Sequence, residues 1–150
     1  MVSIVSEAEA RPYLDQLQAE ALRANIHLAP EHTTAYEPWA LVFTLGSAST
    51  PVSEQPVWSV AGCAGIRIVG ARRVHLGKAF VLPVWRGCGF AWGDNGFVQA
   101  RLDWARGNGF SLATSWFMTP RQEVAALARG WQIEVHGRQW NGTFDLEKSV

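Results

Sequence analysis

The segment from Phe80 to Trp92 constrains the fold of this chain more than any other. An apolar run ends at Pro83, a short basic and glycine-rich turn follows, and a helix is predicted to begin at Phe90 or Ala91. Glycines in such a turn let the backbone approach a ligand closely, and the free N–H groups and positive dipole end of the following helix favour an anion. With Arg86 beside the turn, the sequence predicts a phosphate-binding loop between a strand and a helix.

The composition is that of one folded domain. The chain has 150 residues, 48% apolar and 17% charged, and it is long enough to bury about two thirds of its unfolded surface in a single core. We therefore expect one domain over residues 1–150. Lys plus Arg equals Asp plus Glu, so no net charge draws the protein toward nucleic acid or an anionic membrane, and a nucleic-acid partner is not expected.

Targeting and redox signals favour a cytoplasmic protein. The N-terminus has no basic segment followed by a long apolar one, and nowhere do about 18 apolar residues run together, so we expect no membrane partner. The two cysteines, Cys63 and Cys88, do not make a disulfide framework, and no Cys/His spacing is typical of a metal site.

Periodicity along the chain predicts an α/β fold. Gly77, inside a predicted strand, suggests a bulge or the close approach of a ligand. Val124, Leu127 and Ala128 are expected to form the buried stripe of the last helix, and Asn141-Gly142 is typical of the turn of a terminal β-hairpin. Strands are predicted at about 2–5, 39–45, 57–69, 73–82, 110–117, 132–140 and 143–146, and helices at about 7–24, 91–106 and 119–130.

The loop segment resembles the acetyl-CoA signature of the GCN5-related N-acetyltransferases (GNAT), V-x-P-x-aromatic-[RQ]-G-x-G-x-[GA]. The matching residues are Val81-x-Pro83-x-Trp85-Arg86-Gly87-Cys88-Gly89-Phe90-Ala91. The order of predicted elements, with 25–38 in the place of a second helix that lines the acceptor side, is similar to that of the family over nearly the whole chain. The resemblance implies the GNAT fold, a mixed central β-sheet of about six to seven strands flanked by helices on both faces, with acetyl-CoA as cosubstrate.

The resemblance also implies which residues bind the cofactor. Backbone N–H groups of Cys88 to Ala91 would bind the CoA pyrophosphate, Arg86 would add charge, and backbone groups of the preceding strand would pair with the pantetheine arm. Cys88 is expected to be a spectator, because the family transfers the acetyl group directly. The alternative is that the glycines form only a strand-to-helix turn beside a solvated arginine. The expected cofactor-binding residues are Phe80, Val81, Arg86, Gly87, Cys88, Gly89, Phe90 and Ala91.

Acetyl transfer to an amine requires a base for the amine proton and an acid for the leaving thiolate. Many family members carry a glutamate six residues before the conserved valine. Here that position is His75, whose ordinary pKa suits a general base, although a surface or packing role is the alternative. The family's usual acid, a tyrosine in the last helix, is replaced by Ala126. Ser115, His136 or a water molecule remain as candidates for the acid.

These expectations describe an enzyme that transfers an acetyl group directly from acetyl-CoA to an amine of a small molecule or peptide. Trp39, Trp85 and Trp116 are candidate walls of an acceptor cleft, although core packing is the commoner fate of tryptophan. The alternative function is a non-catalytic CoA-binding protein of the same fold that acts as a sensor or partner-binding module, which Ala126 would suit. Pairing through the C-terminal strands, common in the family, implies a homodimer as one option.

Overall fold

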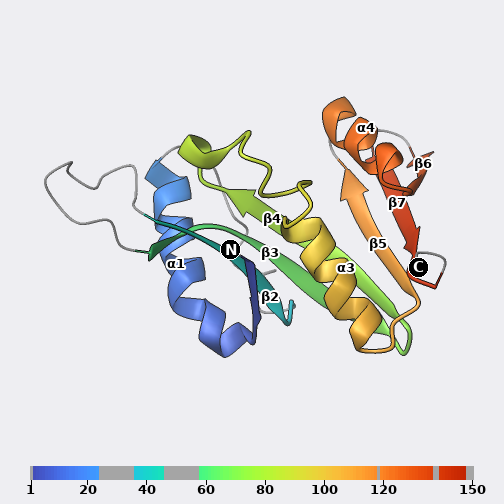
Figure 1. The fold of residues 1–150 in the computed structure, drawn as a ribbon, viewed down its shortest axis with the longest axis horizontal. Helices are drawn as coiled ribbons and strands as arrows, with labels where there is room; N and C mark the ends of the chain where they lie inside the picture. The colour runs from blue at the N-terminus through green and yellow to red at the C-terminus, as the bar shows by residue number, and fades with distance from the viewer. Residues whose placement is uncertain (1, 24–35, 46–57, 118, 137–138, 148–150) are drawn as a thin grey trace, which may run out of the picture.

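One mixed β-sheet organises the molecule (Figure 1). The computed structural model describes residues 2–23, 36–45, 58–117, 119–136 and 139–147. The sheet has seven strands in the order β1-β2-β3-β4-β5-β7-β6, which confirms the predicted architecture. The strands are β1 (Val2–Val5), β2 (Trp39–Leu45), β3 (Trp58–Gly70), β4 (Arg73–Val81), β5 (Leu112–Phe117), β6 (Gln132–His136) and β7 (Gln139–Asp145); the helices are α1 (Glu7–Arg23), α3 (Phe97–Gly107), α4 (Pro120–Ala128) and the short 3-10 turn η1 (Pro83–Trp85).

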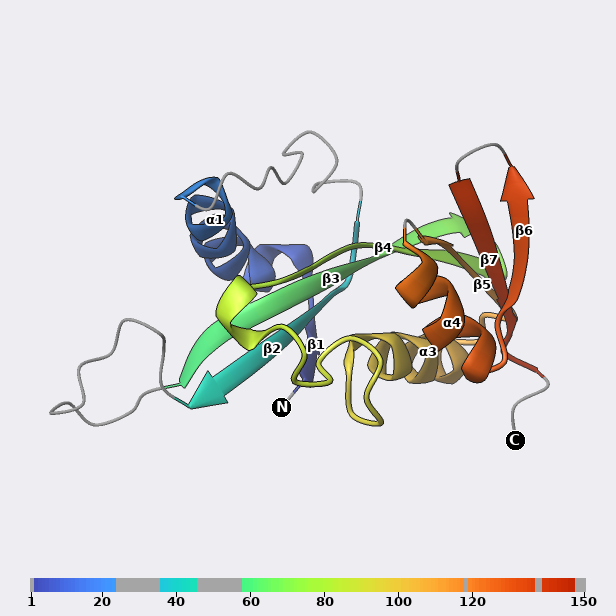
Figure 2. The ribbon, with the colours of Figure 1, turned by 90° about the horizontal axis from the view of Figure 1, so that it is seen from above.

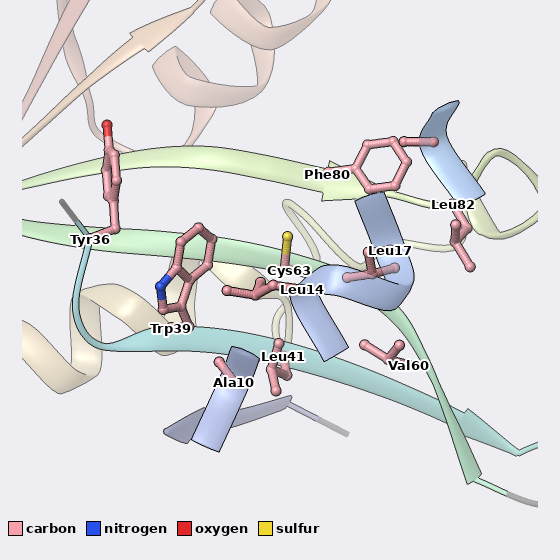
Figure 3. Close-up of a cluster of buried hydrophobic side chains, with 11 residues drawn as sticks. Ala10, Leu14, Leu17, Tyr36, Trp39, Leu41, Val60, Cys63, Phe80 and Leu82 are labelled. Atoms are coloured by element: carbon pink, nitrogen blue, oxygen red, sulfur yellow. The ribbon is translucent and has the colours of Figure 1, made fainter. Parts of the chain in front are cut away.

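Helices cover both faces of the sheet, as expected. Figure 2 shows α1 on one face and α3 with α4 on the other. The α1 face is a closely packed apolar cluster, shown in Figure 3, that joins Ala10, Leu14, Leu17 and Ala21 of the helix to Trp39, Leu41, Val60, Cys63, Phe80 and Leu82 of the sheet side. None of the helices in the described part of the chain is both long and apolar enough to cross a membrane.

The strands β4 and β5 are parallel but pair over only a short length. Their register runs from Arg73 opposite Leu112 to Leu76 opposite Ser115 and stops there. Figure 1 shows the two strands side by side where they begin and apart at their arrowheads. The backbone groups on the β5 side of the second half of β4 therefore have no neighbouring strand.

A β-bulge in β4 marks the point of divergence. Gly77 pairs with Gly65, whereas Phe80 pairs with Cys63, so two residues of β4 stand opposite Ala64 alone. Lys78, at the bulge, has a positive φ of 55°, a conformation that costs energy in a residue with a side chain. The β-bulge that Gly77 suggested is confirmed and lies directly after this glycine.

The bulge is held from both faces of the sheet. From the α3 side, the buried Arg101 donates from Nη1 to the carbonyl oxygens of Gly65 at 3.0 Å and Gly77 at 3.5 Å. Burial lowers the pKa of the Arg101 guanidinium to about 10, which still leaves it charged at neutral pH. From the other side Tyr36 lies across β3 and β4 (Figure 3), so close that a Cβ on Gly65 would lie 2.8 Å from its ring and one on Gly77 would lie 2.7 Å from its hydroxyl.

Two sequence predictions about the C-terminal third are wrong. Asn141 and Gly142 lie inside β7, opposite Glu134 and Ile133, so they do not join the two strands. The connection between β6 and β7, residues 137–138, lies outside the described residues. Gly142 is needed within the strand because a Cβ there would lie 2.3 Å from the ring of Phe117.

The predicted buried stripe of α4 is also wrong. Val124 is 68% exposed, Leu127 is 52% exposed and Ala128 is exposed, whereas Ala126 is fully buried. Aromatic side chains of the neighbouring strands and loop fill the space beneath α4. The small Ala126 therefore completes the contact, and the larger apolar residues face away from the sheet.

We predict that Gly65→Ala destabilises the protein by about 1–3 kcal/mol, because the new methyl group would overlap the buried Tyr36 ring. Gly70→Ala, in the same strand, is the matched control. A Cβ there meets its nearest neighbour at 3.8 Å, so the change should cost less than about 0.5 kcal/mol. Urea denaturation of the three proteins measures the difference, and equal stabilities of the two variants would contradict the close packing of Tyr36.

Candidate cofactor and acceptor site

The glycine-rich loop has the backbone conformation of an anion-binding turn. After η1, Gly87 and Gly89 adopt φ values of +83° and +81°, and Cys88 between them does not have a positive φ. Alternation of this kind turns successive N–H groups toward one point. Within the described residues, the N–H groups of 88–91 donate to no backbone carbonyl. The predicted set of donors therefore remains available to a ligand.

The helix after the loop does not contribute its N-terminus, contrary to the sequence prediction. α3 begins at Phe97 instead of Ala91, and the N–H groups of Phe97 and Val98 donate to the carbonyls of Phe90 and Ala91 at 2.7 and 3.1 Å. Residues 93–96 are two glycines, an aspartate and an asparagine, all of which are poor helix formers. The chain therefore forms hydrogen-bonded turns here before the helix starts. The N–H groups left free beside the cavity therefore belong to the loop and not to α3.

A cavity of about 540 Å³ opens beside this loop. One wall is the end of β4 and the loop, and the other is α4, across the space where β4 and β5 diverge. The side chains and backbone that line it are those of Val81, Trp85, Arg86, Gly87, Gly89, Phe90, Ala91, Trp92, Thr119, Arg121, Gln122, Ala125 and Arg129.

Arg86 links the loop to the strand. Its Nε donates to the carbonyl of Val81 at 3.0 Å, and its guanidinium lies 5.7 Å from the centre of the Phe80 ring. Leu82 N–H bonds to Ala61 of β3, so the backbone groups of the preceding residue, Val81, point to the open side left by β5. The structure thus brings the predicted cofactor residues together at one edge. Six of the eight line the cavity, Phe80 contacts Arg86, and Cys88 lies between two glycines that line it.

His75 lies on the α1 side of the sheet and is 5% exposed. Its Nδ1 is 2.9 Å from Oγ1 of Thr114, and its ring lies 4.7 Å from that of Trp116. Burial, and then the charges of Arg67 and Arg101, lower the pKa of His75 to about 4. The imidazole is therefore neutral at physiological pH, free to accept a proton but weakly basic.

Ser115 lies on the opposite face. Side chains alternate along β5, so Ser115 faces away from the side that carries Thr114 and His75. Its hydroxyl donates to the carbonyl of Leu76 at 2.7 Å, at the last pair of the β4–β5 ladder. The two predicted catalytic residues are thus close in the sheet but not on one surface.

The other candidates divide between core and site. Trp39 is 1% exposed and belongs to the core, Trp85 lines the cavity, and Trp116 is 56% exposed beside His75. Ala126 is buried and points away from the cavity. The side chain of His136 and most of the segment 25–38 lie outside the described residues.

Sequence reasoning missed the α4 wall of the cavity. Arg121, Ala125 and Arg129 follow one another at intervals of four, the spacing of one helix face. That spacing was available in the sequence. The sequence analysis assigns the apolar residues of α4 to a buried stripe. It therefore gives no reason to expect a ligand on the polar face of this helix.

No protein-family model and no curated protein matches this sequence, but solved structures match its fold. A candidate N-acetyltransferase from Lactobacillus plantarum superposes with a TM-score of 0.69 at 12% identity over 97% of both chains. A spermidine N-acetyltransferase variant from Vibrio cholerae gives 0.65 at 13% identity over 99% of this chain and 96% of that one.

N-acetylglutamate synthase from Neisseria gonorrhoeae, solved with coenzyme A and N-acetyl-glutamate, gives a TM-score of 0.60 at 18% identity. It matches over 97% of this chain but only 35% of its own length. At such identities the comparisons establish the fold. The chain has the fold of the GCN5-related N-acetyltransferases, as its loop signature and element order indicate.

The two cysteines should react very differently with iodoacetamide. Cys88 is exposed in the loop, whereas Cys63 is buried and burial raises the pKa of its thiol to about 12. We expect mass mapping of the native protein to find Cys88 alkylated and Cys63 unmodified, with both alkylated in denaturant. Comparable labelling of Cys63 in the native protein would contradict its burial in β3 against α1.

Stability should fall in acid partly because of His75. The unfolded chain binds a proton at the ordinary pKa of 6.5 and the folded one only near 4, so the unfolded state binds more protons between these values and stability declines as the pH falls from 6.5 toward 4. His75→Gln removes this contribution. Denaturation midpoints from pH 8 to pH 4 should therefore drop more steeply for the wild type, and parallel profiles would refute the low pKa.

Proposed function

We propose that the protein is an acetyl-CoA-dependent N-acetyltransferase that binds its cosubstrate in the cavity between the glycine-rich loop and α4. The observation that carries the proposal is the coincidence of free loop N–H groups, a strand edge at Val81 with no neighbouring strand and flanking arginines around one cavity. A diphosphate fits the loop donors, and an extended amide-containing arm fits the strand edge, where it would pair as a strand does. CoA combines these two chemical features.

The reaction requires little covalent chemistry from the protein. The acceptor nitrogen forms a bond to the thioester carbonyl carbon, the bond from carbon to sulfur breaks, the amine loses a proton and the thiolate gains one. Holding the two reactants in line supplies much of the rate. The thioester would lie where β4 leaves β5, close to Leu76 and Ser115, and the Ser115 hydroxyl is a proton donor within that region.

The acceptor would approach from the face that carries His75 and Trp116. The exposed ring of Trp116 offers an apolar surface, and the neutral imidazole is a hydrogen-bond acceptor for an amine. With a pKa near 4, His75 is better suited to orienting the amine or a water molecule than to storing its proton. This surface supports a small, partly apolar amine as acceptor.

The alternative is a CoA-binding protein that transfers nothing. The burial of Ala126, where the family resemblance expects a tyrosine, favours it. Release of free CoA from acetyl-CoA, with and without an amine mixture, separates the two proposals. A binder should release none above the rate in buffer.

Filling the loop should abolish cofactor binding. We predict that Gly89→Trp weakens acetyl-CoA binding at least about tenfold, because its side chain would occupy the cavity and disturb the loop donors. Gly109→Trp is the matched control, since Gly109 has a similar φ of +85° with no atom within 4 Å of its Cβ position and does not line the cavity. Calorimetric titration gives both affinities. Equal binding by folded samples of the two variants would refute the site.

A further inference from the structure

The α4 wall of the cavity carries two arginines that the proposed diphosphate site does not need. Arg121 and Arg129 both line the cavity, with Ala125 midway between them on the same face of the helix. Neither makes an ion pair with a carboxylate among the described residues. Asp94 shares a smaller adjoining cavity of about 110 Å³ with Arg129, but no salt bridge joins them.

The charge of the cavity exceeds what a diphosphate requires. Its lining includes three arginines and no aspartate or glutamate. Arg86 is fixed on the strand side by its bond to Val81, next to the loop donors. The guanidinium groups of α4 stand on the other wall, so they are placed to bind a second, separate anionic group.

Arg129 is held in place before any ligand binds. Its Nη1 donates to the carbonyl of Ala125 at 3.2 Å, and its guanidinium lies 5.7 Å from the centre of the Trp92 ring. An arginine packed on an aromatic ring loses less freedom when it binds a phosphate, and its remaining N–H groups stay available.

We propose that Arg121 and Arg129 bind the 3′-phosphate of coenzyme A, so that the protein selects CoA over dephospho-CoA. A phosphate monoester carries about −1.5 to −2 charges at neutral pH and accepts several charge-assisted hydrogen bonds. It is the only anionic group of CoA outside the diphosphate. This inference rests on the proposed function, because it assumes that the diphosphate occupies the loop.

The test compares CoA with dephospho-CoA by calorimetric titration of the full chain. We expect the wild type to bind CoA at least about tenfold more tightly, the scale of one or two charge-assisted hydrogen bonds. The double variant Arg121→Gln/Arg129→Gln should bind CoA as weakly as the wild type binds dephospho-CoA, with its own affinity for dephospho-CoA unchanged. Arg73→Gln, at an exposed arginine outside the cavity, is the control and should behave as the wild type.

Each other outcome overturns the inference. Equal binding of the two ligands by the wild type, a comparison that needs no variant, would show that the 3′-phosphate is not recognised. If the double variant lost affinity equally for both ligands, its arginines would bind the diphosphate instead. If neither ligand bound to the wild type, both the proposed function and the inference would be refuted. Equal binding of the two ligands by the wild type, or an equal loss in the double variant, would refute the inference but leave the proposed function intact.

Discussion

The extra residue in β4 is the constraint on which the rest of the site depends. Before the bulge, Val74 and Leu76 pack toward α3; after it, Phe80 packs toward α1, because a shift of one residue exchanges the faces of a strand. The ladder to β5 ends at Leu76, immediately before the bulge. The divergence of the two strands, the lack of a neighbouring strand beside Val81 and the cavity beyond it all follow from this local irregularity.

Keeping the bulge requires an unusual set of buried contacts. A charged guanidinium without an acidic partner among the described residues is costly to bury, yet Arg101 is 4% exposed and its donors go to backbone carbonyls. Gly65 and Gly77 leave room for Tyr36 on the opposite face. The Cys63 thiol lies 3.8 Å from the carbonyl of Lys78, the bulged residue. The opening between β4 and β5 is thus stabilised by residues that do not line the cavity.

Helices and strands were predicted well from the sequence where a local pattern determines their position. They were predicted less well where tertiary packing determines where an element begins or ends. The strands 2–5 and 39–45 were recognisable from short apolar runs, and the loop donors at Cys88 to Ala91 from the glycine-rich motif and its family resemblance. The start of α3 was misplaced because the carbonyls of the loop, a tertiary feature, cap the helix at Phe97. The dipeptide Asn141-Gly142 predicts a turn, because the signal contains no information about the Phe117 ring, which needs a glycine beside it.

In the candidate site, too, the local motif was predictable and the tertiary arrangement was not. The motif placed Val81, Arg86 and the glycines together, but the wall formed by α4 depends on how a distant helix is docked across the divergent strands. The unperturbed pKa of His75 suggested a strong base, whereas burial and two arginines make it a weak one. Neither the position of α4 across the strands nor the low-dielectric surroundings of His75 can be inferred from composition and residue spacing.

The most direct measurement is a titration of ¹⁵N-labelled protein with CoA, followed by the backbone amide signals. If the loop alone binds the diphosphate, the largest shifts and the strongest protection from hydrogen exchange should fall on Gly87 to Ala91, with a further change at Val81. The amides of Phe97 and Val98, already bonded to loop carbonyls, should change little. Changes centred on Phe97 and Val98, or on a surface away from the cavity, would contradict the account.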